Sequence, residues 1–162
     1  MPPRTNATRL LDQRRISYEV VEYDPREFHA ATEVAAMVGA PAGQVFKTIV
    51  VLREDRGKRP LLVIVPGDRE VDLKRLAAGL GEKKLRVAPQ REAETLTRLQ
   101  VGGISALALI NRGFEVVLDR AAEAFAAEGI YVSAGQRGLN VRLRPADLAA
   151  VTGASLLDAS TP

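Results

Sequence analysis

The sequence predicts an α+β fold, a single compact domain in which helices flank a mixed, largely antiparallel sheet. Length and composition favour one domain, since 162 residues with 46% hydrophobic side chains can bury a proper core. The segments with strand-like patterns outnumber those with helical spacing and do not alternate with them strictly. Tight turns separate several of these segments, which favours antiparallel neighbours over a doubly wound parallel sheet. We therefore expect residues 1–162 to form this one domain.

The first half of the chain is expected to contain two short helices and three strands. Apolar residues recur at helical spacing among the first arginines, and Gly39 ends the second helix. The last two strands flank a polar loop with Gly57 near its tip, so we expect them to pair as an antiparallel hairpin. In chain order, these elements are a helix at 4–15, a strand at 17–24, a helix at 31–39 and strands at 45–52 and 60–65.

The second half is expected to contain four helices and four strands. Asp72 can cap a helix through its side-chain oxygen, and Pro89 and Pro145 stand at or near the start of two others. The turn GQRG joins two strands that we expect to be neighbours. In chain order, the helices are at 72–81, 89–99, 120–129 and 145–153, and the strands at 84–88, 115–119, 130–135 and 139–144.

Composition excludes several kinds of chemistry. The chain has no cysteine, so neither a disulfide nor a thiolate nucleophile is possible. His29 is the only histidine, which excludes a zinc site of the His and Cys type and any catalytic pair that lacks this residue. The phosphate-binding patterns GxGxxG and GxxxxGK[ST] are absent. We expect neither a metal nor a cofactor.

Charge and hydropathy indicate a cytoplasmic protein without a membrane partner. The 23 basic and 20 acidic residues give a net charge of +3, which permits a polyanionic partner but does not require one. Most of these charges are expected to form a solvated surface. No apolar run reaches transmembrane length, and the first residues lack the apolar core of a signal peptide.

Lys47 interrupts a strand that is otherwise almost entirely apolar. An ammonium ion in such surroundings must reach water or meet an anion, because burying it alone is costly. Two interpretations are open. The lysine lies near the start of the strand and its stem reaches water, or it points into a pocket and holds an anionic or carbonyl oxygen.

Gly102 and Gly103 form a second break in the pattern, between a predicted helix and an apolar segment. Glycine occurs where the backbone takes a positive φ or closely approaches another group. Consecutive free N–H groups there could hold an oxyanion, and the alternative is a plain turn that ends the helix.

Other polar residues give weaker indications. Asp119, Ser133 and Asn140 lie near strand ends, where capping or turn roles would explain all three. His29 stands just before a predicted helix, and we expect its imidazole to be solvent-exposed and idle.

Five stretches recur in one order and spacing along the chain. They are GQVFKTIVV, DLKRLAAGLGEKKLRVA, VGGIS, VVLD and IYVSAGQRGLNVRL. Together they resemble the YbaK family of stand-alone aminoacyl-tRNA deacylases, which is related to the editing domain inserted in bacterial prolyl-tRNA synthetases. The resemblance covers nearly the whole chain and implies a compact α+β domain around a mixed sheet.

The resemblance also implies roles for particular residues. Lys47 takes the place of the functional lysine in the motif V-[FY]-K-T, and Tyr23 that of a pocket tyrosine. Catalytic roles are therefore expected for Lys47, Gly102 and Gly103. The expected substrate-binding residues are Tyr23, Thr48, Ile104, Ser105, Ser133, Arg137 and Asn140.

The chain departs from the family pattern at three positions. Ala106 stands where GGIS usually continues with proline, Ala134 replaces the first glycine of YVSGG, and Asn140 replaces the carboxylate of RGLD. The segment ALALINRG also differs from the shorter polar stretch of Cys-tRNA(Pro) deacylases. These departures leave the amino-acid specificity open.

The activity that the resemblance implies is trans-editing, the clearing of a small mischarged amino acid from tRNA(Pro). Cysteine is the first choice of amino acid and alanine the second, and prolyl-tRNA synthetase is a candidate second partner. The expected wall residues of a small pocket are Ala30, Ala31, Ile104, Ala106 and Ala134.

The expected chemistry is substrate-assisted, because the chain offers no obvious pair of nucleophile and base. The vicinal ribose hydroxyl could activate a water, or the thiol of a cysteine substrate could attack the ester. Lys47 would bind a phosphate, ribose or carbonyl oxygen without acting as a nucleophile. The alternative is a non-catalytic module that binds a tRNA acceptor end or a nucleotide.

Contacts to tRNA phosphates would come from basic side chains and would weaken with salt. The sequence gives no indication of the oligomeric state. The candidate cations are Arg53, Arg56, Lys58, Arg59, Lys83, Lys84 and Arg86.

Overall fold

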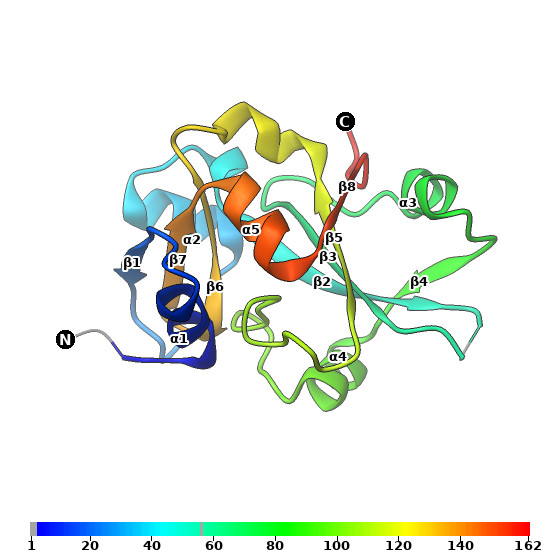
Figure 1. Cartoon of the computed structure of the whole chain (residues 1–162), viewed down its shortest axis with the longest axis horizontal. Helices are drawn as coiled ribbons and strands as arrows, with labels where there is room; N and C mark the ends of the chain where they lie inside the picture. The colour runs from blue at the N-terminus through cyan, green and yellow to red at the C-terminus, as the bar shows by residue number, and fades with distance from the viewer. Residues whose placement is uncertain (1–2, 56) are drawn as a thin grey trace.

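The computed structural model describes residues 3–55 and 57–162, which form the helices and strands drawn in Figure 1. The strands are β1 (Glu19–Glu22), β2 (Phe46–Arg53), β3 (Leu61–Pro66), β4 (Leu85–Val87), β5 (Glu115–Asp119), β6 (Ile130–Gln136), β7 (Leu139–Leu143) and β8 (Ser155–Leu157). The α-helices are α1 (Asn6–Gln13), α2 (Ala31–Val38), α3 (Leu73–Leu80), α4 (Gln90–Thr97) and α5 (Pro145–Thr152). Two short 3₁₀ helices are η1 (Ala42–Gln44) and η2 (Arg120–Phe125).

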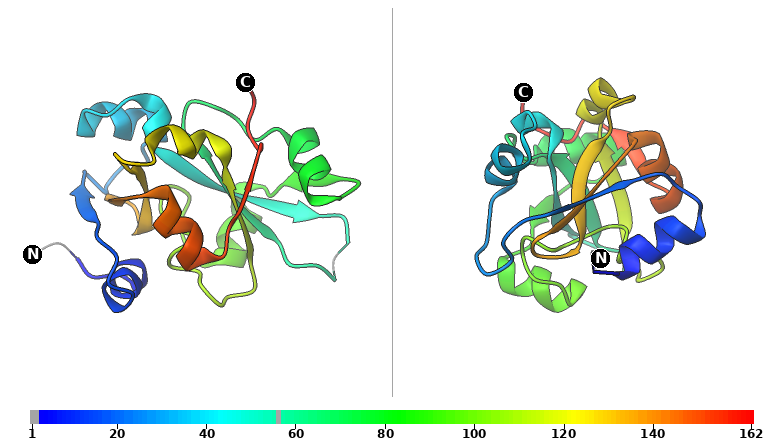
Figure 2. Two further views of the ribbon diagram at one scale, coloured as in Figure 1. Left: turned by 45° about the horizontal axis from the view of Figure 1, so that its top comes forward. Right: turned by 90° about the vertical axis from the view of Figure 1, so that its left-hand side faces the viewer.

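The strands form two hydrogen-bonded sheets. The larger sheet has the order β4-β2-β3-β5-β8, and the smaller has the order β1-β7-β6. Four of the strand pairs are antiparallel, and the pairs β3–β5 and β5–β8 are parallel. Viewed from the side of the smaller sheet, the helices lie around the periphery and the strands pass through the middle (Figure 2). The predicted α+β class with a mixed, largely antiparallel arrangement is confirmed.

The hairpin of β2 and β3 is central to the larger sheet. Its strands pair antiparallel, as the sequence predicts, and Lys47 lies opposite Val65. All six residues of β3 are buried, because both faces of this strand are covered. Leu62 and Ile64 pack into one hydrophobic cluster, whereas Val63 and Val65 pack into another. The unbroken apolar sequence of β3 follows from this burial on both faces.

The start of β2 joins the two sheets. Val45 forms a parallel bridge with Tyr131 of β6, and its carbonyl accepts a hydrogen bond from the N–H of Gly67 at 2.8 Å. The side-chain amide of Gln44 donates to the carbonyl of Gly129 at 2.9 Å. These contacts hold the N-terminal end of β2 against β6, and they place Lys47 between the two sheets.

The segment predicted as a helix at 120–129 differs from the structure. It forms only the short 3₁₀ helix η2, at the end of β5. The carboxylate of Asp119 accepts hydrogen bonds from the N–H of Ala121 at 3.0 Å and from the N–H of Ala159 at 2.7 Å. Asp119 therefore both caps η2 and fixes the C-terminal segment, which confirms the capping role expected for it.

Two further regions could not be assigned from sequence patterns. Strand β8 has three residues, too few for a periodic signal, and it was not predicted. The segment 101–113 forms turns, yet Ile104, Leu107 and Leu109 from it are buried in the largest cluster. Among the described residues, no helix has the length and apolar character that crossing a bilayer requires.

Candidate active site

A cavity of about 240 Å³ lies where the start of β2 meets β6, β7 and the N-terminal end of α2. Its walls are largely apolar and include Ala31, Val34 and Ile49. Seven of the ten residues predicted for the site line this cavity. They are Tyr23, Lys47, Thr48, Gly102, Ile104, Ser133 and Asn140.

Lys47 is the only lysine or arginine among the described residues that line the cavity. Its side chain is 24% exposed, and its Nζ lies 3.3 Å from Oε1 of Glu70 and 3.5 Å from the carbonyl oxygen of Gly67. Because Glu70 is exposed, this ion pair is weak, and such pairs contribute about 0–1 kcal/mol. The stem reaches the solvent edge and the side chain also borders the cavity, while the binding of a substrate oxygen by Lys47 stays a prediction.

The loop at Gly102 and Gly103 packs against the hairpin of β6 and β7. A Cβ on Gly103 would come within 2.9 Å of the backbone nitrogen of Arg137, so only glycine fits there without a shift. The N–H of Gly103 donates to the carbonyl of Gln100 at 2.8 Å, which differs from the expectation of two free amides. Gly102, with φ +94°, lines the cavity, and within the described part of the chain its N–H makes no hydrogen bond.

Ser105 and Arg137 do not line the cavity, and their hydrogen bonds instead hold the segment that contains Gly102 and Gly103. Ser105 is buried, and its Oγ accepts a hydrogen bond from the N–H of Ala108 at 3.3 Å. Arg137 donates from Nε to the carbonyl of Val101 at 2.7 Å. Its guanidinium carbon lies 5.6 Å from the centroid of the Phe28 ring. In this structure both residues support the shape of the site.

Asn140 and Ser133 face each other across the pair of β6 and β7. Asn140 is 4% exposed, and no hydrogen bond from its side-chain amide is found among the described residues. Its donors and acceptors are therefore available to a ligand in the cavity. Ser133 accepts a hydrogen bond from the N–H of Gly135 at 3.2 Å, which matches the turn role expected from its position.

Tyr23 places a phenol at the cavity wall, and its N–H donates to the carbonyl of Gly138 at 2.9 Å. Burial raises the pKa of the Tyr23 phenol above its ordinary value, and the backbone of Gly138 and the charge of Arg137 offset part of this rise. At neutral pH the phenol is therefore protonated and can donate a hydrogen bond.

The expectation that His29 is solvent-exposed is wrong, and its being idle stays a prediction. Its side chain is 11% exposed and lines the cavity, with Nδ1 3.5 Å from Oε2 of Glu33 and without a hydrogen bond. The ring stands edge-on to that of Tyr23, with centroids 5.9 Å apart. The loop between β1 and α2 folds back over the cavity, and no periodic pattern in the sequence indicates this path.

Sequence reasoning also missed several other lining residues, among them Phe28, Gly67 and Val101. A Cβ on Gly67 would lie 2.4 Å from the Cβ of Ala31, so this glycine lets α2 approach the strand pair closely. Of the described residues, no three His, Cys, Asp or Glu side chains are grouped in a way that could hold a metal ion.

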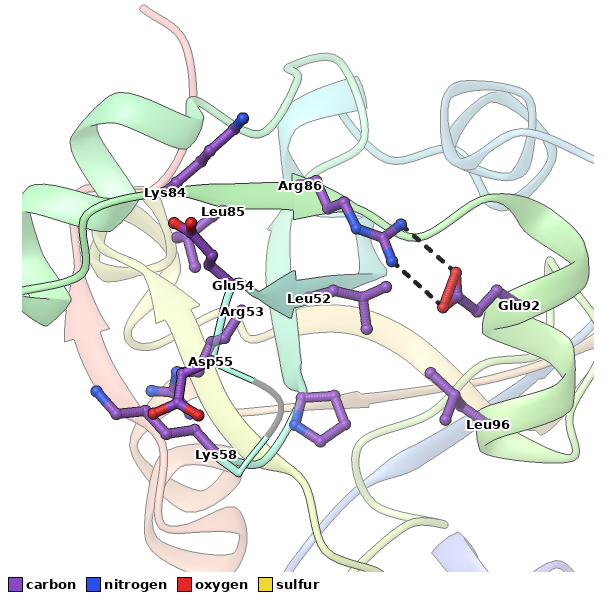
Figure 3. A pocket seen from close by; sticks show the side chains of 11 residues that line it. Leu52, Arg53, Glu54, Asp55, Lys58, Lys84, Leu85, Arg86, Glu92 and Leu96 are labelled. Atoms are coloured by element: carbon purple, nitrogen blue, oxygen red, sulfur yellow. Dashed lines mark hydrogen bonds and ion pairs between the residues drawn. The ribbon is translucent and has the colours of Figure 1, made fainter.

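Several of the predicted phosphate-binding cations surround a separate groove between the β2–β3 loop, β4 and α4 (Figure 3). Most of them are already paired with carboxylates. Arg53 and Lys58 both contact Glu82 at 3.0 Å. Arg86 lies 3.5 Å from Glu92, and dashed lines in Figure 3 mark this pair. Lys84 lines the groove and takes part in none of the ion pairs of the described residues, whereas Arg56 lies outside those residues.

Comparison with known proteins identifies the family. Residues 26–151 match the family model described as an aminoacyl-tRNA editing domain. The chain belongs to this family. The resemblance to the YbaK family and the prediction of an aminoacyl-tRNA deacylase are thereby confirmed at the level of the family.

Individual members of the editing-domain family resemble this chain over most of its length. A presumed Cys-tRNA(Pro)/Cys-tRNA(Cys) deacylase, EbsC of Enterococcus faecalis, is 32% identical over 98% of this chain and 94% of its own. The prolyl-tRNA editing protein ProX of Acetoanaerobium sticklandii is 27% identical over 68% of this chain and 67% of its own. The crystal structure of a presumed trans-editing enzyme for prolyl-tRNA synthetase superimposes with a TM-score of 0.76 at 25% identity, covering 99% of this chain and all of that one.

Proposed function

We propose that this chain is a trans-editing deacylase that clears a small amino acid, cysteine first and alanine second, from mischarged tRNA(Pro). The relative from Enterococcus faecalis supports this proposal through its name and through its similarity along nearly the whole chain. The observation that carries the proposal is geometric. Seven predicted site residues, from segments far apart in the sequence, surround one cavity, and Lys47 supplies the ammonium group at its border among the described residues.

The role proposed for Lys47 is to bind an oxygen of the aminoacyl ester or of the terminal ribose. Charge develops on the carbonyl oxygen when the ester is attacked, and a positioned cation stabilises it. The N–H of Gly102 is a second candidate donor. Lys47 would exchange its contact with the exposed carboxylate of Glu70 for the substrate.

The attacking group is proposed to come from the substrate or from water. With cysteine, the thiol loses its proton and attacks the carbonyl carbon, a C–S bond forms, and the ester C–O bond breaks. The ribose oxygen leaves with a proton, and the product is a cyclic thiolactone. With alanine, a water oriented by the vicinal ribose hydroxyl would attack, and the product would be the free amino acid.

The proposed size selection rests on the cavity walls. Ala30, Ala31 and Ile104 line the cavity as predicted. Ala106 and Ala134 are buried in the core and do not line the cavity, so the expectation that they form the wall is wrong. A small apolar cavity distinguishes side chains that differ by one group only about 10- to 200-fold, so shape alone does not separate cysteine from alanine.

The proposed partner is tRNA, which the protein would bind in the cytoplasm, where aminoacylation takes place. A complex with prolyl-tRNA synthetase stays a prediction.

The test is a panel of tRNA(Pro) samples charged with cysteine, alanine, serine or proline. We expect the cysteinyl ester to disappear fastest and the prolyl ester to persist, with thiolactone as the product from cysteine. If no ester in the panel is cleared, the proposed activity is wrong. Binding of tRNA without loss of any ester would favour the alternative, a non-catalytic acceptor-end module.

A further inference from the structure

Phe28 places an exposed aromatic ring at the mouth of the cavity. The residue is 50% exposed and also lines the cavity. Single apolar side chains are common on protein surfaces, so exposure alone indicates nothing. What distinguishes Phe28 is its position beside the candidate site and the way its ring is held.

Two contacts fix the ring of Phe28. The guanidinium of Arg137 lies over it at 5.6 Å from the centroid, and the hydrogen bond from Nε of Arg137 to Val101 holds this group in place. On another side, a Cβ at Gly102 would come within 3.0 Å of Cδ2 of the ring. The glycine therefore lets the ring lie directly against the loop. A planar surface that is fixed before binding loses little entropy when a ligand stacks on it.

The size of the cavity leaves part of the proposed substrate outside it. Its volume of about 240 Å³ is below the roughly 300–1,000 Å³ of sites that enclose drug-sized ligands. The end of an aminoacyl-tRNA consists of an amino acid, a ribose and an adenine base. With the ester beside Lys47, the amino acid and part of the ribose would fill the cavity, and the base would lie at its mouth.

We propose that Phe28, held by Arg137, is the stacking platform for the terminal adenine of the tRNA. One face of the ring is covered by the guanidinium and the exposed part is open to the base. This inference rests on the proposed function, since it takes the substrate to be an aminoacyl-tRNA. Stacking on an aromatic side chain raises affinity by about 5- to 150-fold per base and does not require hydrogen bonds to that base.

The first test uses fluorescence and does not depend on activity. The chain has no tryptophan, so Phe28→Trp introduces a single indole at the mouth of the cavity. We expect adenosine monophosphate to quench its emission in a saturable way, and ribose 5-phosphate to have no effect. The matched control is Val87→Trp, at an exposed position of β4 outside the cavity, which should not respond to either compound. Absence of saturable quenching at Phe28→Trp, or equal quenching by both compounds or at both positions, overturns the platform.

The second test compares two substrates. Phe28→Ala should lower kcat/KM for the aminoacyl-tRNA by about 5- to 150-fold through KM, and Phe28→Tyr should retain activity. The same amino acid esterified to ribose without a base should react equally with wild type and Phe28→Ala. Equal loss on both substrates overturns the platform, because the ring would then shape the aminoacyl pocket. An active Phe28→Ala variant with unchanged KM also overturns it and leaves the proposed function intact, whereas an inactive wild type refutes the proposed function.

Discussion

An apolar strand can contain Lys47 because the start of β2 borders the cavity, whereas the middle of the strand is buried. Lys47 is the second residue of β2, where the strand borders the cavity, whereas Val50 and Val51 further along are buried. Its contact with Glu70 involves one exposed partner and is weak. The ammonium group is therefore able to exchange this carboxylate for an oxygen of the substrate.

Removing the competing carboxylate should favour the substrate. Glu70→Gln is expected to raise kcat/KM by up to about fivefold, because an exposed ion pair contributes at most about 1 kcal/mol. Steady-state deacylation assays measure this change. The control is Glu128→Gln, an exposed carboxylate that removes the same charge away from the cavity and should change nothing. A drop of more than tenfold in Glu70→Gln would mean that Glu70 itself serves the reaction.

Replacing His29 distinguishes a substrate-assisted reaction from a reaction that uses a protein side chain as the base. If the substrate or its ribose hydroxyl supplies the proton transfer, His29→Gln should lower the rate by no more than about tenfold, because general base catalysis contributes about 100- to 10,000-fold. The pH–rate profile of His29→Gln between pH 5 and 8 should keep the shape of the wild-type profile. Glu33→Gln should show the same small loss of rate and the same profile. Loss of at least 100-fold together with a flattened profile would identify His29 as the base.

At the scale of elements, the glycine loop and the β6–β7 hairpin form one unit. Arg137 bonds to Val101 of the loop, and Gly103 lies against the hairpin backbone. From sequence alone, replacing either glycine of the loop is expected to impair turnover more than stability. The structure changes this expectation for Gly103, since its neighbours are backbone atoms that cannot move aside.

Gly103→Ala should therefore destabilise the protein. A Cβ 2.9 Å from backbone atoms forces a shift that costs about 1–3 kcal/mol, or roughly 2–12 °C in Tm for a chain of this size. Gly102→Ala serves as the comparison, because its Cβ would meet the side chains of Phe28 and Arg137 and no backbone atoms, while its φ of +94° strains any residue other than glycine. We expect both variants to lower Tm, and the larger loss in kcat/KM for Gly102→Ala, because Gly102 lines the cavity. Equal melting temperatures for wild type and Gly103→Ala would refute the close packing.

The fold was predictable wherever burial leaves a periodic or continuous apolar pattern. The β2–β3 hairpin is an example, as are the helix capped by Asp72 and the strand pair β6–β7. Strand β8 is too short to leave such a pattern. Lys47 and Gly102 could be assigned to the site because they break local rules and match family motifs. His29 and Phe28 could not, since the path of the loop before α2 depends on contacts with distant segments.

At the scale of the whole molecule, the cavity and the groove of Figure 3 lie at opposite ends of β2. Lys47 and Arg53 are six residues apart on this strand, which corresponds to about 20 Å. A tRNA whose aminoacyl ester enters the cavity would thus be able to extend its acceptor stem toward the groove. Because most groove cations are paired with carboxylates, we expect only a modest electrostatic contribution.

Lys84 should contribute more to tRNA binding than the paired lysine of the same groove. Lys84→Ala is expected to weaken binding and to reduce the slope of log affinity against log salt by about 1. Lys58→Ala is the matched control, since Lys58 already contacts Glu82 at 3.0 Å and should give the smaller change. Binding titrations between 50 and 200 mM salt measure both, about the range over which phosphate contacts weaken strongly. Identical slopes for wild type and Lys84→Ala would exclude the groove from the tRNA path.

The proposal that the cavity is the site of deacylation is tested most directly by the single-turnover rate of Lys47→Ala on cysteinyl-tRNA(Pro). Removing one electrostatic contact to a developing oxyanion costs about 2.7–4 kcal/mol, so we expect a loss of about 100- to 1,000-fold. The melting temperature should stay close to that of wild type, because the ammonium lies at the solvent edge and its ion pair is weak. A rate near that of wild type in a folded Lys47→Ala variant would contradict the assignment of this cavity as the active site.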